Sequence, residues 1–255
     1  MKNKLIFLAA SAILASCLLG WMPRNADDLN EALKKADFYR GGQVPGVAWD
    51  LTVRNIEKGE LKNEISLFVE ASSIQERQFA LITFLEPKKF QGQKLLIRDN
   101  NMWFSKIELR SPIPISSRQR LSGPAANADV AAANYYNDYS IAGSEEAVLN
   151  GEPCWVLDLH AKNNLVPYSR IKYWISKGKN FGLQAEYYGK SDKIIKSALF
   201  EYNNKIEYNK SRYDYISKIT ITDQVNTEDK STLNISAVKF GSFSDSKFQT
   251  NRLKD

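Results

Sequence analysis

From residue 47 onward, apolar and polar side chains alternate with a period of two, which is the pattern of β-strands that cover one face. Residues 47–54 begin the alternation, and residues 65–71 repeat it after the turn EKGE. Six later segments continue it with short turns between them: CWVLDLHA, SRIKYWIS, GLQAEYYG, KIIKSALFEYN, YISKITITD and LNISAVKF. Because consecutive strands joined by short turns usually pair with their neighbours, the sequence predicts a mainly β protein built as an antiparallel meander.

Residues 78–87, QFALITFLEP, depart from this alternation because they are apolar on both faces. Such a strand is stable only where both of its faces are covered. We therefore expect this strand to be buried on both sides.

Residues 27–40, DDLNEALKKADFYR, have helical spacing, with Leu29, Leu33 and Ala36 on one face and two acids at the start. The following GGQVPG is a helix-breaking turn. The sequence thus predicts one amphipathic helix before the strands.

Residues 111–140 form the longest stretch without strand periodicity. The segment contains three prolines, the pair Arg118 and Arg120, and an alanine-rich run. Long irregular segments inside a compact domain are usually functional, most often as lids. We expect a helix-bearing lid here, with few buried contacts and high mobility.

The first residues predict export. Lys2 and Lys4 precede an uncharged run over residues 5–22, which is the pattern of a signal sequence. LASC, residues 14–17, has the residue order of a bacterial lipobox, so Cys17 is the candidate lipidation site. A plain signal peptide with a soluble product, or an uncleaved anchor, remains an alternative, although spanning helices need about 20 apolar residues.

The expected organisation is an export signal over residues 1–16, or to about 22, a short tether over 17–26, and a single domain over 27–255 with its lid at 111–140. Composition agrees with one β domain of about 235 residues. The whole chain carries a net charge of +6. Basic and acidic residues are scattered, which indicates an ordinary solvated surface, at most a loose attraction to anionic lipid, and no nucleic-acid partner.

Residues with catalytic or metal-binding chemistry are few. His160 is the only histidine, and Cys154 alternates with Val156 as a small core residue would. A multi-histidine metal site and a Ser-His-Asp triad are therefore not indicated. The sequence predicts no enzyme and no cofactor, although two carboxylates distant in sequence could still form a hydrolase site.

The lid sequence PIPISSRQRLSGPAANADVAAANYYNDYS, together with GEPC and VLDL at residues 151–159 and YSRIKYW at 168–174, resembles the LolA-like outer-membrane lipoprotein-sorting family. The resemblance extends from about residue 36 to 253. It implies an incompletely closed antiparallel β-barrel, or half-barrel, wrapped around a helical lid, with an apolar cavity that receives acyl chains.

The resemblance also suggests site residues. The cavity candidates are strand aromatics: Trp49, Phe68, Phe79, Phe84, Trp103 and Trp155. The lid and rim candidates are Arg118, Arg120, Tyr135 and Tyr139. The two arginines would hold the lid to the barrel rim or meet cargo headgroups; alternatively, they only satisfy backbone carbonyls in an irregular loop.

The function implied is non-enzymatic binding and transfer of lipid or lipoprotein acyl chains in the bacterial periplasm. The implied partners are acyl chains, a membrane-embedded transporter as donor, and the membrane surface. Burial of each methylene is worth about 0.8 kcal/mol, so a carrier must pass its cargo directly between apolar environments. The alternative is an envelope interaction module that keeps the fold and fills the cavity with aromatics.

Overall fold

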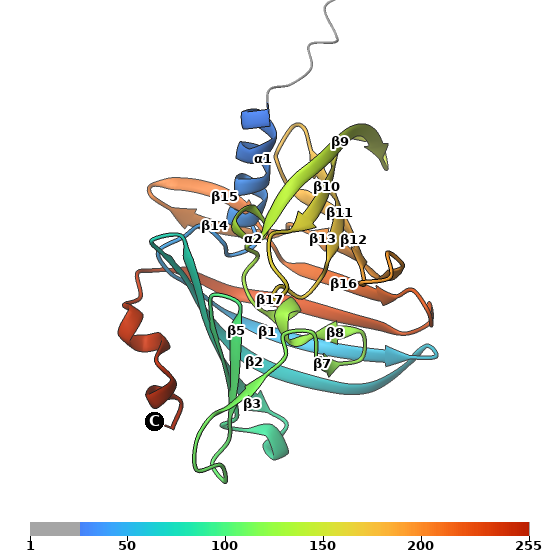
Figure 1. The fold of residues 1–255 in the computed structure, drawn as a ribbon. Helices are drawn as coiled ribbons and strands as arrows, with labels where there is room; N and C mark the ends of the chain where they lie inside the picture. Colours follow the sequence, from blue (N-terminus) through green and yellow to red (C-terminus); the bar gives the residue numbers. More distant parts are fainter. Residues whose placement is uncertain (1–25, 255) are drawn as a thin grey trace, which may run out of the picture.

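One open antiparallel sheet of 13 strands dominates the computed structural model, which describes residues 26–254 (Figure 1). In spatial order its strands are β6 (Ile113–Ile115), β5 (Asn101–Ser105), β4 (Lys94–Arg98), β3 (Arg77–Glu86), β2 (Glu60–Ile74), β1 (Val47–Glu57), β17 (Lys230–Phe240), β16 (Lys218–Asp223), β13 (Ile194–Glu201), β12 (Gly182–Tyr188), β11 (Arg170–Ser176), β10 (Glu152–Ala161) and β9 (Tyr139–Leu149). The sheet curves strongly, and its end strands β6 and β9 are not paired with each other. The expected half-barrel is confirmed.

The strand order departs from a simple meander at two places. Strand β17 pairs with β1 on one side and β16 on the other, and β16 in turn pairs with β13. Two meanders, β1 to β6 and β9 to β13, are thereby joined through the last two strands. A separate hairpin, β14 (Asn204–Tyr208) with β15 (Ser211–Tyr215), lies between β13 and β16 in the chain and is not part of the large sheet.

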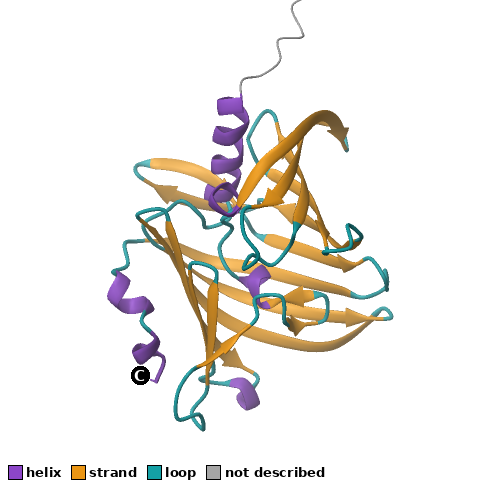
Figure 2. Ribbon diagram, viewed as in Figure 1, coloured by secondary structure: helices purple, strands orange, loops and turns teal. Residues whose placement is uncertain are grey.

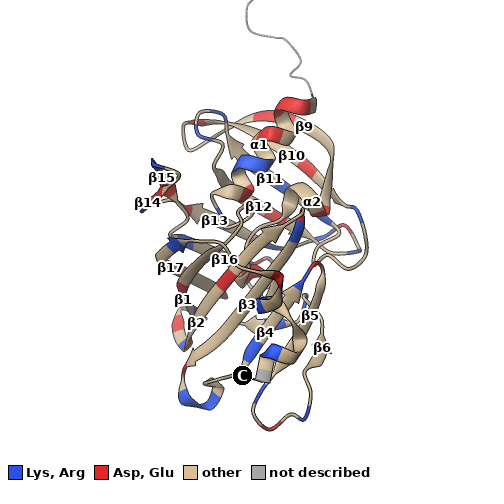
Figure 3. Cartoon of the chain, turned by 90° about the vertical axis from the view of Figure 1, so that its left-hand side faces the viewer, with Lys and Arg blue, Asp and Glu red and all other residues tan. Residues whose placement is uncertain are grey.

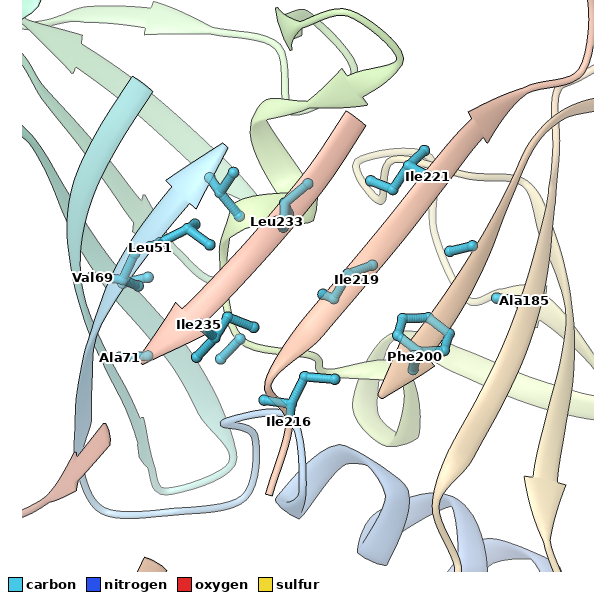
Figure 4. Packing of buried hydrophobic residues seen from close by; sticks show 14 of the residues in the cluster. Leu51, Val69, Ala71, Ala185, Phe200, Ile216, Ile219, Ile221, Leu233 and Ile235 are labelled. Carbon is cyan, nitrogen blue, oxygen red and sulfur yellow. The ribbon is translucent and has the colours of Figure 1, made fainter. Parts of the chain in front are cut away.

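The concave face of the sheet carries the main core. Inward positions follow the predicted alternation, as in β1, where Val47, Trp49, Leu51 and Val53 are all buried. Figure 4 shows side chains from β1, β17, β16 and β13 projecting to one side of the sheet: Leu51, Leu233, Ile235, Ile219, Ile221 and Phe200. This apolar row spans the junction of the two meanders and joins them into one domain.

The predicted N-terminal helix is confirmed as α1 (Ala26–Phe38), with Leu29, Leu33 and Ala36 buried. It stands at one end of the sheet beside β11 and α2 (Tyr135–Asp138) (Figure 2). Gly41, with a φ of +89°, follows the helix in a left-handed conformation that glycine adopts without strain. The turn after the helix brings Arg40 inside the molecule, where it is buried.

The strand expected to be buried on both sides is β3, and the expectation is confirmed only for its first part, because Leu85 near its end is 41% exposed. Within β3, Ala80, Ile82 and Phe84 belong to the concave core, whereas Phe79 packs on the opposite face. That outer face is covered by two 3-10 helices at the C-terminus, η3 (Asp245–Phe248) and η4 (Thr250–Lys254). Phe248 stacks on Phe79, with ring centroids 5.5 Å apart.

Residues 111–140, the lid segment, lie across the concave side of the sheet (Figure 1). They contain β6, the hairpin of β7 (Arg120–Ser122) and β8 (Ala125–Ala126), the 3-10 helix η2 (Asn127–Val130), and α2. The expected shortage of buried contacts is wrong, because the alanines and Val130 of this segment pack into the core. A further 3-10 helix, η1 (Lys88–Phe90), lies on the β3–β4 connection.

Lysine, arginine, aspartate and glutamate side chains are interspersed over strands and loops (Figure 3). The scattered distribution expected from the sequence is therefore seen in three dimensions. Within the described residues, no helix is both long and apolar enough to cross a membrane.

Candidate functional site

An interior pocket lies between the lid segment and the concave face of the sheet. Its volume is about 850 Å³, including the part open to solvent. The apolar lining comes from strands β3, β4, β5 and β16 on one side and from the lid on the other: Ala80, Ile97, Met102, Ile219, Ile221, Ala128, Ala131, Ala132 and Ala133. Small alanines on the lid leave the space that larger apolar side chains would fill.

A buried ion pair fastens the lid to the sheet. Lys196 of β13 points inward and pairs with Asp129 of η2, and the exposed fractions of the two side chains are only 6% and 8%. Asp129 also accepts hydrogen bonds from the Tyr168 hydroxyl at 2.7 Å and from the Ala126 N–H at 2.7 Å. These partners compensate the burial of both charges, so the lid segment has one preferred position on the sheet, which is called its seat below.

The hydroxyl of Ser231 and the glycine at position 123 also hold the lid segment against the sheet. Ser231 of β17 donates to the Ser122 carbonyl and accepts from the Ala125 N–H. Gly123 has a φ of +54°, and a Cβ built there would lie 1.8 Å from the Asn55 side chain. The β7–β8 hairpin thus lies directly against β1 and β17, and only glycine fits at its tip.

Tyrosines form the wall of the pocket near α2. The hydroxyls of Tyr135 and Tyr187 lie 2.9 Å apart, and Tyr139 donates to the Tyr168 carbonyl at 3.1 Å. Burial raises the pKa of Tyr139, Tyr168 and Tyr187. These phenols therefore stay neutral and act as hydrogen-bonding groups.

The predicted lid residues Tyr135 and Tyr139 both line the pocket. Arg118 lies beside it and donates to the carbonyls of Asn164, Val166 and Pro167 in the β10–β11 loop. Arg118 therefore satisfies backbone carbonyls, which is the alternative role given for it above. The same contact holds the lid segment against that loop. Arg120 donates to Asp223 at 3.3 Å, with its side chain 74% exposed.

The predicted cavity aromatics are not brought together. Trp49 lies on the concave face and lines a smaller pocket next to the main one, and Phe84 is buried in the same core. Phe79 and Trp103 pack on the outer face beneath the C-terminal helices, and Phe68 lies on the outer side of β2. Trp155 packs against the concave core beneath Lys177, away from the pocket.

The pocket contains polar residues that the sequence analysis did not select: Arg40, Gln78, Asp129 and Tyr187. A signal for one of their partners was present, because Lys196 stands in an otherwise apolar inward row with Ala198 and Phe200. A lysine in such a row must find a buried anion. For Arg40, at the end of a helix, no local pattern indicated burial.

Other reactive side chains lie elsewhere. Cys154 is buried, as expected of a small core residue, and is a free thiol, and His160 is half-exposed on β10 beside Asp158. Among residues 26–254, no group of three or more His, Cys, Asp or Glu side chains is placed to hold a metal ion. Cys17 lies outside the described residues.

Asp37, at the end of α1, gives the protein a pH-dependent stability. Burial raises its pKa from 3.8 to about 7, against the hydrogen bond from the Tyr136 N–H and the charge of Arg40, which lower it. Between these pH values the folded protein keeps the proton and the unfolded chain loses it. Stability from this group is therefore largest at low pH and falls as pH rises to about 7, in total by about 4 kcal/mol.

We expect Asp37→Asn to remove this loss, because an amide cannot ionise and its oxygen can still accept from the Tyr136 N–H. Relative to the wild type, the variant should gain stability as pH rises from about 5 to about 8. Urea unfolding across this range measures the effect, with the exposed Asp27→Asn as control. Parallel pH profiles for Asp37→Asn and wild type would contradict the prediction.

Comparison with known proteins adds a family and a fold. A family model described as "Uncharacterized protein" matches residues 76–255. No curated protein sequence matches the chain.

Three solved structures are similar over most of their length. A LolA superfamily protein from Nitrosomonas europaea has a TM-score of 0.75 and 23% identity, covering 87% of this chain and 97% of that one. A domain from Vibrio parahaemolyticus described as an outer membrane lipoprotein-sorting protein has a TM-score of 0.74 and 18% identity, covering 91% and 100%. A DUF1329 family protein from Desulfovibrio piger has a TM-score of 0.72 and 17% identity, covering 89% and 98%. At these identities the likeness shows the fold, which is the LolA-like fold expected from the lid sequence.

Proposed function

The chain belongs to the family of uncharacterized proteins whose model matches residues 76–255, and from this premise and its fold we propose that it binds and transfers acyl chains of lipids or lipoproteins. We place this role in the bacterial cell envelope, as in lipoprotein sorting. The observation that carries the proposal is the apolar pocket beneath the lid segment. It is a concave, mostly apolar space with a few polar side chains, which is the usual character of small-molecule sites.

The lining suits a hydrocarbon chain. Isoleucines from β4 and β16 face alanines of the lid across the pocket, and burial of each methylene there contributes about 0.8 kcal/mol. A bound chain would leave by direct exchange with a membrane or a partner protein, because release into water forfeits this energy. The proposal involves binding and transfer only, with no catalytic step and no cofactor.

Access to the pocket requires the lid segment to move. It is held on the sheet by the packing of Val130 and the alanines and by polar contacts around Asp129 and Ser122, and Arg118 holds it to the β10–β11 loop. Polar contacts of this kind can be exchanged for contacts with water when the lid opens, whereas a purely apolar seam cannot. We propose that the lid gates the pocket.

For the location, we propose export to the periplasm and anchoring through a lipid on Cys17, with a soluble periplasmic form as the alternative. The candidate partners are a membrane-embedded transporter as donor and the membrane surface. A tether of about ten residues would hold the domain close to the bilayer, where direct transfer is possible.

A second candidate function is an envelope interaction module without carrier activity. It is favoured by the tyrosines that occupy part of the interior, since Tyr168, Tyr173 and Tyr187 are almost fully buried there. Acyl-chain binding by the purified protein separates the two candidates.

Acyl-chain binding can be tested by placing a larger side chain in the pocket. Ala128 lines it from the lid and is half-buried, so Ala128→Trp should occupy the space without disturbing the sheet. We expect the variant to lose at least about tenfold in affinity for a fluorescent long-chain fatty acid, since the indole displaces several methylenes of the ligand. Titration followed by fluorescence gives the affinity.

The matched control is Ala142→Trp, on the exposed edge strand β9. It introduces the same side chain away from the pocket and should bind like the wild type. Absence of binding by the wild-type protein, or equal binding by a folded Ala128→Trp variant, would remove the carrier proposal for this pocket.

A further inference from the structure

Arg40 is a buried cation in the wall of the interior pocket. Its side chain lines both the main pocket and the smaller one beside Trp49, and the residue is only 9% exposed. One N–H group donates to the Tyr173 hydroxyl at 3.4 Å, whereas the buried Nε has no hydrogen-bond partner among the described residues. The guanidinium lies over the rings of Phe200, at 4.2 Å, and Tyr135, at 5.0 Å.

The ring contacts hold the guanidinium but do not replace an anion. An aromatic face attracts a cation through its quadrupole and accepts few of the five N–H donors of arginine. The carboxylate nearest in sequence, Asp37, lies close enough for the charge of Arg40 to lower its pKa, but no salt bridge joins the two within residues 26–254, and Asp37 accepts from the Tyr136 N–H. Arg40 is therefore fixed in direction with donors still available.

The other charged residues that line the main pocket have partners of their own. Asp99 forms a bidentate pair with Arg77, and Asp129 pairs with Lys196. Asp138 accepts from Asn100 at 3.4 Å. Among the charged residues that line this pocket, Arg40 and Asp138 form no salt bridge within the described part of the chain, and Arg40 is the cation of the two.

Gln78 is a second buried polar side chain facing the same space. It lines the main pocket from β3, is 6% exposed, and neither its amide nitrogen nor its amide oxygen has a hydrogen-bond partner in the described part of the chain. Buried polar groups are nearly always hydrogen-bonded, because a buried group without a partner loses its hydrogen bonds to water and gains none in return. Two such groups in one pocket indicate a ligand that is itself polar at one end.

We propose that the interior pocket holds a single-chain amphiphile whose head is an oxyanion, a carboxylate or a phosphate monoester, with Arg40 as its cationic partner and Gln78 as a second donor. The proposal rests on the acyl-chain binding proposed above and adds the class of headgroup. The chain of the ligand would lie along the alanines and isoleucines, and its head would lie against the guanidinium. Arginine suits this role because its planar fork matches the two oxygens of such a group.

The experiment compares ligands that share one chain and differ in the head. Dodecanoate, dodecyl phosphate and dodecanol are titrated calorimetrically into the wild-type full-length protein at one neutral pH. We expect at least one of the anionic ligands to bind about tenfold or more tightly than dodecanol, since hydrogen bonds to a buried charge have this strength. Acetate and inorganic phosphate are titrated as heads without a chain.

Variants then assign the preference to Arg40. Arg40→Met removes the charge and keeps much of the length, and should bring the three dodecyl ligands to within about twofold of one another. Arg54→Gln is the control, because Arg54 is an exposed arginine whose partner is Glu64 on the neighbouring strand. It changes the net charge equally and should keep the preference.

A measurement on the wild type alone covers the case in which Arg40→Met does not fold. Carbon NMR of carboxyl-labelled dodecanoate, or phosphorus NMR of dodecyl phosphate, follows the titration of the bound head. A guanidinium neighbour lowers the pKa of a bound carboxyl by about 1–3, whereas an apolar pocket without a cation raises it.

Each outcome decides between the proposals. Equal binding of all three dodecyl ligands, a preference that survives Arg40→Met, or a raised headgroup pKa would overturn the anionic-head proposal and leave acyl-chain binding intact. Acetate or phosphate binding as tightly as the dodecyl anions would show an anion site unrelated to acyl chains. No binding of any dodecyl ligand would overturn the proposed function itself.

Discussion

Lys196→Met is expected to destabilise the protein by about 3–5 kcal/mol, because it leaves Asp129 charged and buried without its cation. The remaining hydrogen bonds from Tyr168 and the Ala126 N–H do not neutralise the carboxylate. Chemical unfolding measures the loss. The control is Lys62→Met, which breaks an exposed pair with Glu60 and should cost no more than about 1 kcal/mol.

The double variant Lys196→Met with Asp129→Asn tests the coupling directly. The asparagine oxygen can still accept from the Ala126 N–H, and no charge is left unpaired. We expect the double variant to be more stable than the sum of the two single changes predicts, by about 0.5–3 kcal/mol. Additive effects, or a Lys196→Met variant as stable as Lys62→Met, would mean that the pair does not hold the lid.

The same variant bears on the gating proposal. If the ion pair seats the lid segment, its loss should speed hydrogen exchange at the backbone amides of residues 122–139 more than in strand β17. High mobility of the lid in the intact protein stays a prediction. Its buried alanines and the ion pair indicate that the closed position is well defined.

Phe248→Ala is expected to lower stability by about 3–5 kcal/mol, the usual cost of truncating a buried phenylalanine. Phe248 is fully buried against Phe79 and Leu96 on the outer face of the sheet, in a small cluster that Leu253 completes and Trp103 borders. The loss should appear as a lower midpoint in urea unfolding. Acyl-chain affinity should be unchanged in the folded variant, because the pocket is on the opposite face.

Val225→Ala provides the control, since Val225 is 82% exposed and its truncation removes little packing. A Phe248→Ala variant no less stable than this control would show that the C-terminal helices do not contribute to the fold. A loss of acyl binding with unchanged stability would place the binding site on the outer face instead.

Local periodicity explains why several elements could be predicted. The helix at residues 26–38 and the strands have hydrophobic spacings of 3.6 and 2, and these spacings follow from the geometry of one chain segment. Burial of both faces of β3 could be predicted in part for the same reason, since apolar residues such as Phe79 and Leu81 on the second face need a cover. The sequence did not show that the C-terminal residues provide this cover.

The positions of the aromatic residues could not be predicted from hydrophobic spacing alone. Alternation separates Phe79 from Ala80 and Trp103 from Met102, but it does not say which of two apolar faces is concave. The partner of Lys196 was equally hidden, because Asp129 is 67 residues away and meets it only when the lid crosses the sheet.

By itself the sequence determined the local elements, the mainly β class and, through the lid motif, the half-barrel fold, because each of these depends on residues close together in the chain. The tertiary structure alone decided the placement of β17 between β1 and β16, the concave face, the seat of the lid and the burial of Arg40. These features depend on contacts between distant segments, whose free energies no local pattern contains.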